Sequence, residues 1–346
     1  MKKISICLIA FFCAWLTSCS NSDISILKPA VVKVNLSTIN KPFTFQLNPG
    51  DLDDVNESEQ SIRLRMYVYD SKGNLYHKQE KKAPNYLSTV SFEISVQDDS
   101  YQVVVVSDVV SSKTNTIPQY WSVENENKLN SLTVKYLTKD QYCYGSQEIL
   151  GLGSIEVWPG ADATVSIQPA GALICTYFEN IHEYRDVHDM VAFTDRGNDL
   201  YQFSSDGSYV ANPDLNILAT CLEVEDVPNY KYAGSYSYKF LMPQKNMKYS
   251  VGLLDSSGQI LAIKNITFNI EAGKEYFAHV KLDSNLSSGW SFDIYNVTNQ
   301  TLSKSTKNIN DINFIQVRSE SKNSTQTCNQ HKLFDLSSFK VIDFIK

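Results

Sequence analysis

Several features that would indicate an enzyme, a nucleic-acid-binding protein or a membrane-spanning protein are missing from this chain of 346 residues. It has no glycine-rich phosphate loop, no Gly-x-Ser-x-Gly elbow and no His-Glu-x-x-His helix, so we predict no enzymatic activity and no cofactor. Lys and Arg number 31 against 38 Asp and Glu, and this balance argues against a nucleic-acid partner. No apolar run reaches the about 20 residues that a membrane-crossing helix needs.

Helical periodicity is also missing, since no pattern with a period of 3.6 residues extends over a helical length. The chain is instead rich in aromatic residues (12%), including 20 tyrosines. Tyr, Val and Ile favour pleated, half-buried surfaces, so the composition predicts a mostly β protein.

The first residues have the order of a secretory signal. Lys2 and Lys3 precede a short apolar run, residues 4–15, and Leu16-Thr17-Ser18-Cys19 follows. This tetrapeptide resembles the lipobox of bacterial lipoproteins. The resemblance implies cleavage of a signal peptide (1–18) and acylation of Cys19 by chains such as palmitate. The alternative is an ordinary signal peptide with a chance cysteine.

Processing at this point would leave 328 residues with a net charge of about −9, because residues 1–18 contain two lysines and no acidic residue. Two or three acyl chains anchor a protein stably, whereas one holds it only marginally. We therefore expect a tether (19–30) that links membrane lipid, through acylated Cys19, to the folded part. Ser20 does not resemble the signal that retains lipoproteins in the inner membrane, and this difference favours the outer membrane. The sequence leaves both the inner leaflet and the outer surface of that membrane as locations of the protein.

Cysteine is scarce beyond the signal. The four cysteines after Cys19 match no metal motif, and export permits disulfides. One of them lies in an apolar run and fits a small buried hydrophobe. We favour no essential disulfide and leave the pairing open for Cys143, Cys175, Cys221 and Cys328.

Apolar and polar residues alternate along most of the chain from Val31 onward. From Ile62 to Tyr69 the even positions are apolar and the odd positions are Arg or Tyr, which predicts a strand with one buried face. Tyr101 to Val106 is apolar on both faces, which predicts a central strand. Short turns such as residues 70–74 join the strands, so we predict antiparallel pairing.

The length predicts two domains behind the tether. We expect an N-terminal β-sandwich (31–160) and a C-terminal β-sandwich (161–297), with the boundary at Trp158-Pro159-Gly160. Beyond them lies a polar tail with an apolar end (298–346), of which residues 298–332 have too little apolar surface to fold alone.

Four stretches resemble fimbrillin-like lipoproteins, including the fimbrial anchor (minor fimbrium) proteins, of the type V fimbriae of Gram-negative oral and gut bacteria. They are Arg-Leu-Arg-Met-Tyr-Val-Tyr-Asp-Ser-Lys-Gly-Asn-Leu (63–75), Tyr-Gln-Val-Val-Val-Val (101–106), residues 151–181 with Trp-Pro-Gly-Ala-Asp, and residues 238–282 with Phe-Leu-Met-Pro. The resemblance implies two tandem transthyretin-like antiparallel β-sandwiches and a role in fimbrial assembly. It also implies partner subunits that bind by β-strand addition.

Two groups of residues could hold a metal ion, but we predict no metal site. His182 and His188 lie near three acidic residues, Glu183, Asp186 and Asp189, and surface histidines are the favoured interpretation. The acidic loop with Asp51, Asp53 and Asp54 has oxygen ligands for calcium, and a solvated loop is again favoured.

Three functions therefore compete. The leading hypothesis is an accessory lipoprotein that anchors or terminates a pilus at the outer membrane. In a shaft or tip fimbrillin, as the resemblance implies, a protease removes the first strand after an arginine, and a neighbour's strand takes its place. A surface glycan-binding lipoprotein would use exposed aromatics, for which Tyr120-Trp121 and Trp158 are the candidates.

Overall fold

Strands dominate the structure, which is a computed structural model. Apart from the short helix α2 (Ser37–Asn40) and the 3-10 turn η1 (Leu129–Ser131), all elements of the described part are strands. The prediction of an all-β fold is confirmed. The structure describes residues 27–40, 60–83, 88–97, 99–111, 119–137, 148–179, 187, 189–194, 197–214, 219–222, 234–255, 257, 260–282, 290–298 and 315–320.

Two sheets form the first sandwich. A three-stranded sheet has the order β4-β1-β9 and a five-stranded central sheet has the order β10-β8-β5-β2-β3. Apolar residues of both sheets belong to one buried cluster. The strands are β1 (Lys28–Asn35), β2 (Gln60–Tyr69), β3 (Leu75–Ala83), β4 (Thr89–Val96), β5 (Tyr101–Ser111), β8 (Gly151–Val157), β9 (Asp162–Ser166) and β10 (Gln168–Pro169).

A third sheet contacts the other face of the central sheet. Its order is β14-β13-β7-β6, and the Tyr69 hydroxyl of β2 donates a hydrogen bond of 3.0 Å to the Glu126 carbonyl just after β6. The prediction of a single buried face for β2 is therefore wrong, because Tyr67 and Tyr69 are as buried as the apolar positions between them. The strands are β6 (Trp121–Glu124), β7 (Thr133–Tyr136), β13 (Gly197–Phe203) and β14 (Tyr209–Asp214).

The sheets on both faces of the central sheet explain why β5 is apolar on both of its faces. It lies between β2 and β8 in the middle of the central sheet, and residues 103–106 are completely buried. The prediction of a central strand at 101–106 is confirmed.

The second sandwich also has two sheets, with orders β16-β11-β19-β20-β21 and β15-β12-β17-β18. A second apolar cluster lies between them. The strands are β11 (Ala172–Glu179), β12 (Asp189–Thr194), β15 (Ala219–Leu222), β16 (Gly234–Leu241), β17 (Gln244–Leu254), β18 (Ile260–Ile270), β19 (Glu275–Leu282), β20 (Trp290–Asn296) and β21 (Ile315–Glu320).

The strand pairing places the junction between the sandwiches later than the turn at Gly160. β9 and β10 follow that turn, yet they pair with β1 and β8 of the first sandwich. The chain crosses to the second sandwich at Gly171, where a Cβ atom would lie 2.4 Å from the Leu241 carbonyl oxygen. Only glycine allows this close approach of two backbones.

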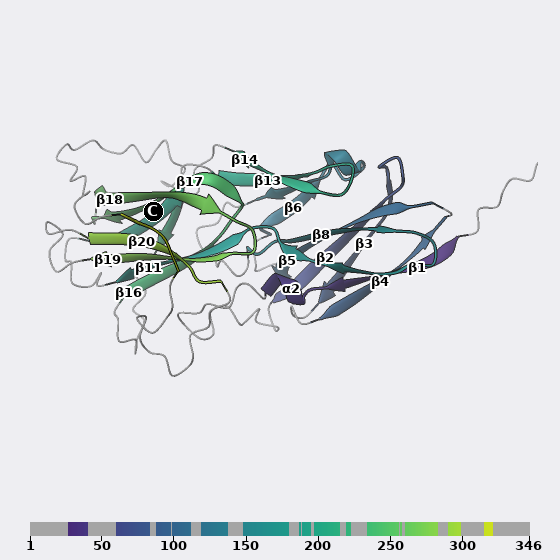
Figure 1. Ribbon diagram of the computed structural model, residues 1–346, viewed down its shortest axis with the longest axis horizontal. Coiled ribbons are helices and arrows are strands. Elements are labelled where there is room, and N and C mark those ends of the chain that lie inside the picture. The colour runs from purple at the N-terminus through teal and green to yellow at the C-terminus, as the bar shows by residue number, and fades with distance from the viewer. Residues whose placement is uncertain are drawn as a thin grey trace, which may run out of the picture.

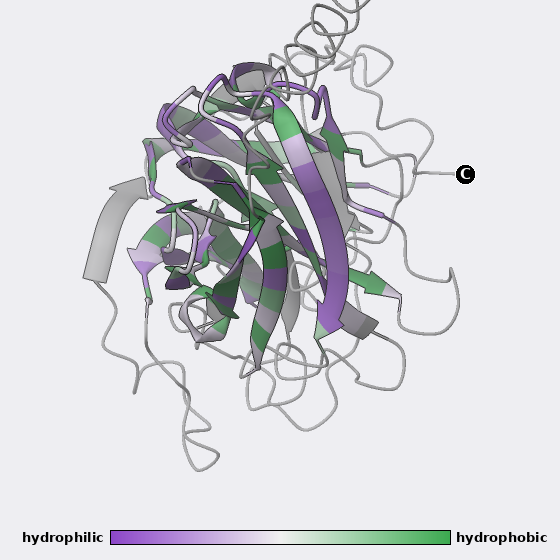
Figure 2. Cartoon of the chain, turned by 90° about the vertical axis from the view of Figure 1, so that its right-hand side faces the viewer, coloured by the Kyte–Doolittle hydropathy of each residue, from purple (hydrophilic) through white to green (hydrophobic). Residues whose placement is uncertain are grey.

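The expected polar tail contributes a strand as well. β21 pairs with β20 at the edge of an existing sheet, where backbone hydrogen bonds do not require the strand to bury a core of its own. Figure 1 shows the two sandwiches along the long axis, with β1 at one end and β16 to β20 toward the other. Coloured by hydropathy, the strands show the alternation expected from the sequence (Figure 2).

Candidate functional site

The first strand occupies the middle of its sheet. β1 runs antiparallel to β4 and parallel to β9, so Val32 lies opposite Phe92 on one side and Ala163 on the other. Val32 and Val34 are completely buried. Without β1, the facing edges of β4 and β9 would lose their ladder partner and the apolar core would be open to water. The first strand is therefore an integral part of the first sandwich.

Both ends of β1 are fixed by further hydrogen bonds. At its start, the Gly160 amide donates to the Pro29 carbonyl (3.0 Å) and the Val31 amide donates to the Ala161 carbonyl (2.8 Å). Gly160 has a φ of 81°, which glycine adopts without strain. Beyond the other end, the Thr38 hydroxyl of α2 donates to the Ile167 carbonyl between β9 and β10.

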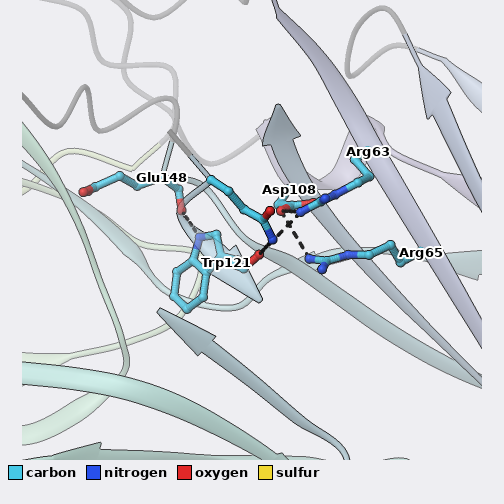
Figure 3. A network of polar contacts seen from close by, with 6 residues as sticks. Arg63, Arg65, Asp108, Trp121 and Glu148 are labelled. Carbon is cyan, nitrogen blue, oxygen red and sulfur yellow. Dashed lines mark hydrogen bonds and ion pairs between the residues drawn. The ribbon is translucent and has the colours of Figure 1, made fainter. Parts of the chain in front are cut away.

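A charged cluster lies on β2 and β5, next to the start of β6 (Figure 3). Arg63 binds Asp108 with two hydrogen bonds, Nη2 to Oδ2 at 2.6 Å and Nε to Oδ1 at 3.0 Å, and Arg65 Nη2 lies 3.2 Å from the same carboxylate. Burial disfavours the charged form of Arg63 and lowers its pKa. The hydrogen bonds to Asp108 and its negative charge have the opposite and larger effect, so the pKa of Arg63 is raised. Burial lowers the pKa of Arg65, against the opposing attraction of Asp108.

The cluster matters because Arg63 is the first arginine of the sequence. Its backbone pairs with Lys82 of β3 on one side and with Asp108 of β5 on the other. A protease needs an extended, accessible backbone, and this bond lies inside the central sheet. The Arg63 bond is therefore shielded in the folded state.

A second buried network joins the two sandwiches. The Trp121 indole N–H donates to the Glu148 carbonyl (2.7 Å), and Glu148 Oε1 accepts from Tyr136 and from Lys239 Nζ of β16 at 2.6 Å. Glu148 Oε2 also accepts from the Phe240 amide at 3.0 Å. The Glu148 carboxylate thus connects the third sheet with the second sandwich.

The chain was compared with protein families, curated proteins and solved structures. No protein-family model and no curated protein matches the chain. A candidate adhesin from Bacteroides thetaiotaomicron matches with a TM-score of 0.51 and 10% identity, over 79% of this chain and 97% of that chain. The two proteins share a fold.

Two fimbrial proteins are also among the similar solved structures. The fimbrial anchor protein Mfa2 from Porphyromonas gingivalis has a TM-score of 0.43 and 10% identity, over 79% of this chain and all (100%) of that chain. A fimbrial assembly protein from Parabacteroides distasonis has a TM-score of 0.41 and 11% identity, over 84% of this chain and 99% of that chain.

The candidate aromatic platforms differ in exposure. Tyr120 and Trp121 are each only 1% exposed, so they cannot serve as the sugar platform for which the glycan-binding alternative offered them as candidates. Trp121 packs against Tyr136 and Tyr201 in the core between sheets. Trp158, in the turn before β9, is 58% exposed.

Other predicted residues fall outside the described part of the chain, namely Leu16, Thr17, Ser18, Cys19, Asp51, Asp53, Asp54, Cys143, His182, Glu183, Asp186, His188 and Cys328. Cys221 lies in β15, Asp189 begins β12, and Cys175 is a buried thiol of β11. Within the residues that the structure describes, no group of three or more His, Cys, Asp and Glu side chains could hold a metal ion. No helix in that part is long and apolar enough to cross a bilayer.

Proposed function

We propose that this protein is a lipid-anchored, non-enzymatic subunit of an adhesive fimbrium that anchors or terminates the pilus at the outer membrane. Leu16-Thr17-Ser18-Cys19 supports the lipid anchor, and the fold shared with a candidate adhesin supports a role at the cell surface. The motifs that resemble fimbrillin-like lipoproteins support membership of a pilus.

The position of β1 is the observation that favours an anchor subunit over a shaft subunit. Between Cys19 and Arg63 the sequence has no arginine, only Lys28, Lys33 and Lys41. Lys28 and Lys33 lie in β1, and Arg63 is inside the central sheet. An arginine-specific protease therefore meets no accessible arginine before the core, and both β1 and the lipid remain.

An uncleaved first strand leaves β1's place in the sheet occupied. A neighbouring subunit that binds by strand addition would then use another edge of the protein. This geometry fits a subunit at the membrane end of a pilus, which needs only one such partner.

The glycan-binding alternative has less support than it had from the sequence. Of its two candidate platforms, the buried pair Tyr120-Trp121 is unavailable to a sugar, and one exposed ring at Trp158 remains.

Replacing Cys19 with alanine tests the lipid anchor. Because the acyl chains would supply the membrane attachment, Cys19→Ala is expected to move the protein from the membrane pellet to the soluble fraction. Fractionation with a carbonate wash measures this. Cys13→Ala, which changes a cysteine within the apolar run of the signal, is the matched control and should leave the protein in the pellet. A Cys19→Ala protein that still pellets after the wash contradicts the lipoprotein proposal.

The N-terminus of the protein in purified fimbriae tests the anchor assignment. We expect peptide mapping by mass spectrometry to find a chain that begins at acylated Cys19 and is present at low copy number. Lys41 is followed by Pro42, which hinders most lysine-directed proteases. A chain that begins near residue 42 or 64 and repeats along the filament would instead identify a shaft subunit.

A further inference from the structure

Large exposed apolar side chains gather at the end of the protein where β1 begins. Leu27, directly before β1, is 54% exposed, Tyr76 of β3 is 39% exposed, and Trp158 is the most exposed aromatic residue among them. Exposed leucine and tryptophan side chains are not unusual singly, but their grouping at one end requires an explanation.

Hydrogen bonds and strand pairing connect the segments that carry these three residues to the start of β1. The turn that contains Trp158 is bound to the start of β1 through the Gly160 amide and the Pro29 carbonyl. The Tyr76 hydroxyl donates to the Ser95 carbonyl at 2.9 Å, and Ser95 lies opposite Pro29 in the sheet. Leu27, Tyr76 and Trp158 are called the end surface below.

The end surface lies at one extremity of the long axis. β1 starts at the right-hand end in Figure 1, with the second sandwich toward the opposite end, and Figure 2 views the molecule from the side of the right-hand end. This is also the end from which the chain continues toward Cys19.

The length of the intervening chain restricts what the end surface can meet. Only seven residues lie between Cys19 and Leu27, and the eight Cα–Cα steps, at about 3.6 Å each, span at most about 30 Å. An acyl anchor at Cys19 would therefore keep the end surface close to the bilayer at a high effective concentration.

We propose that the end surface lies on the bilayer and inserts Trp158 at the headgroup level, so that the long axis stands away from the membrane. The proposal rests on the proposed lipidation of Cys19. Tryptophan and tyrosine favour this zone because their rings are apolar while their N–H and O–H groups reach water. Both basic and acidic residues occur in the strand ends and turns next to these residues in sequence, such as Lys28 after Leu27 and Asp70 and Lys72 before Tyr76, so the contact does not require anionic lipid.

The three tryptophans beyond the signal make the test selective, because Trp121 and Trp290 are buried and only Trp158 is exposed. The full lipidated protein is reconstituted into phosphatidylcholine vesicles with or without brominated acyl chains, which quench tryptophan at the interface. We expect the emission of Trp158 to be quenched by the brominated lipid and to become inaccessible to aqueous acrylamide. Both effects should be lost in Trp158→Ser and should persist at high salt.

The outcomes separate the two proposals. A protein that does not float with the vesicles contradicts lipidation itself. A protein that floats while Trp158 remains open to acrylamide and unaffected by brominated lipid overturns the membrane contact alone. A saturable change in Trp158 emission on adding oligosaccharide to vesicle-bound protein, with no quenching by brominated lipid, assigns the surface to glycans and also overturns it.

Discussion

Val105→Asp is expected to unfold the first sandwich or to reduce its stability severely. Val105 is completely buried in β5, opposite Met66 of β2 on one side and Gly153 of β8 on the other. An aspartate there has no counter-charge among its strand neighbours, and an unpaired buried charge costs several kcal/mol. That cost is a large share of the about 5–15 kcal/mol by which domains are usually stable. Urea denaturation followed by circular dichroism measures the loss.

Val210→Asp is the matched control, since it makes the same change at a position of β14 that is 63% exposed. Its stability should change by no more than about 0.5 kcal/mol. If Val105→Asp melts within about two degrees of the wild type, β5 is not the buried centre of the molecule.

Glu148→Ala should cost about 3–5 kcal/mol, the usual effect of removing one partner from a buried ion pair. The Glu148 side chain is completely buried and accepts hydrogen bonds from Lys239, Tyr136 and the Phe240 amide. The change removes the negative charge beside Lys239, whose side chain is only 9% exposed. Thermal and chemical denaturation of the single variants and of Glu148→Ala with Lys239→Met form a double-mutant cycle.

We expect the double variant to be more stable than the sum of the single losses predicts, because it leaves no buried charge behind. The Lys33–Asp162 pair is the control: its atoms lie 2.8 Å apart, close to the 2.6 Å of Lys239 and Glu148, but its side chains are 42% and 63% exposed. Exposed pairs contribute about 0.2–1 kcal/mol. Equal coupling energies in the two cycles would show that Glu148 does not join the sandwiches.

The candidate site was only partly predictable from the sequence. The lipobox is a local signal, and the absence of arginine before Arg63 is visible by inspection. The pairing of β1 with β9 was not predictable, because the two strands lie far apart in the chain and many apolar segments could supply a similar strand.

The two aromatic candidates for a sugar platform also show what the sequence could not predict. Trp121 and Trp158 both occur near polar residues and turns, and the sequence offers each as a platform. The structure buries Trp121 of β6 against Tyr201 of β13 and Phe240 of β16, and it leaves Trp158 exposed. Burial depends on which distant strands cover a residue, and local composition does not contain that information.

The sequence by itself determined the all-β class, the central strand at 101–106 and the short turns, because alternation, β-branched residues and turn residues act over a few positions. The tertiary structure alone decided that β2 is buried on both faces, that Arg63 and Arg65 share Asp108, and that the chain crosses between the sandwiches at Gly171. Each of these depends on contacts between segments far apart in the chain. Such contacts form because two distant segments together remove their apolar faces from water. Neither segment alone specifies which partner it will meet.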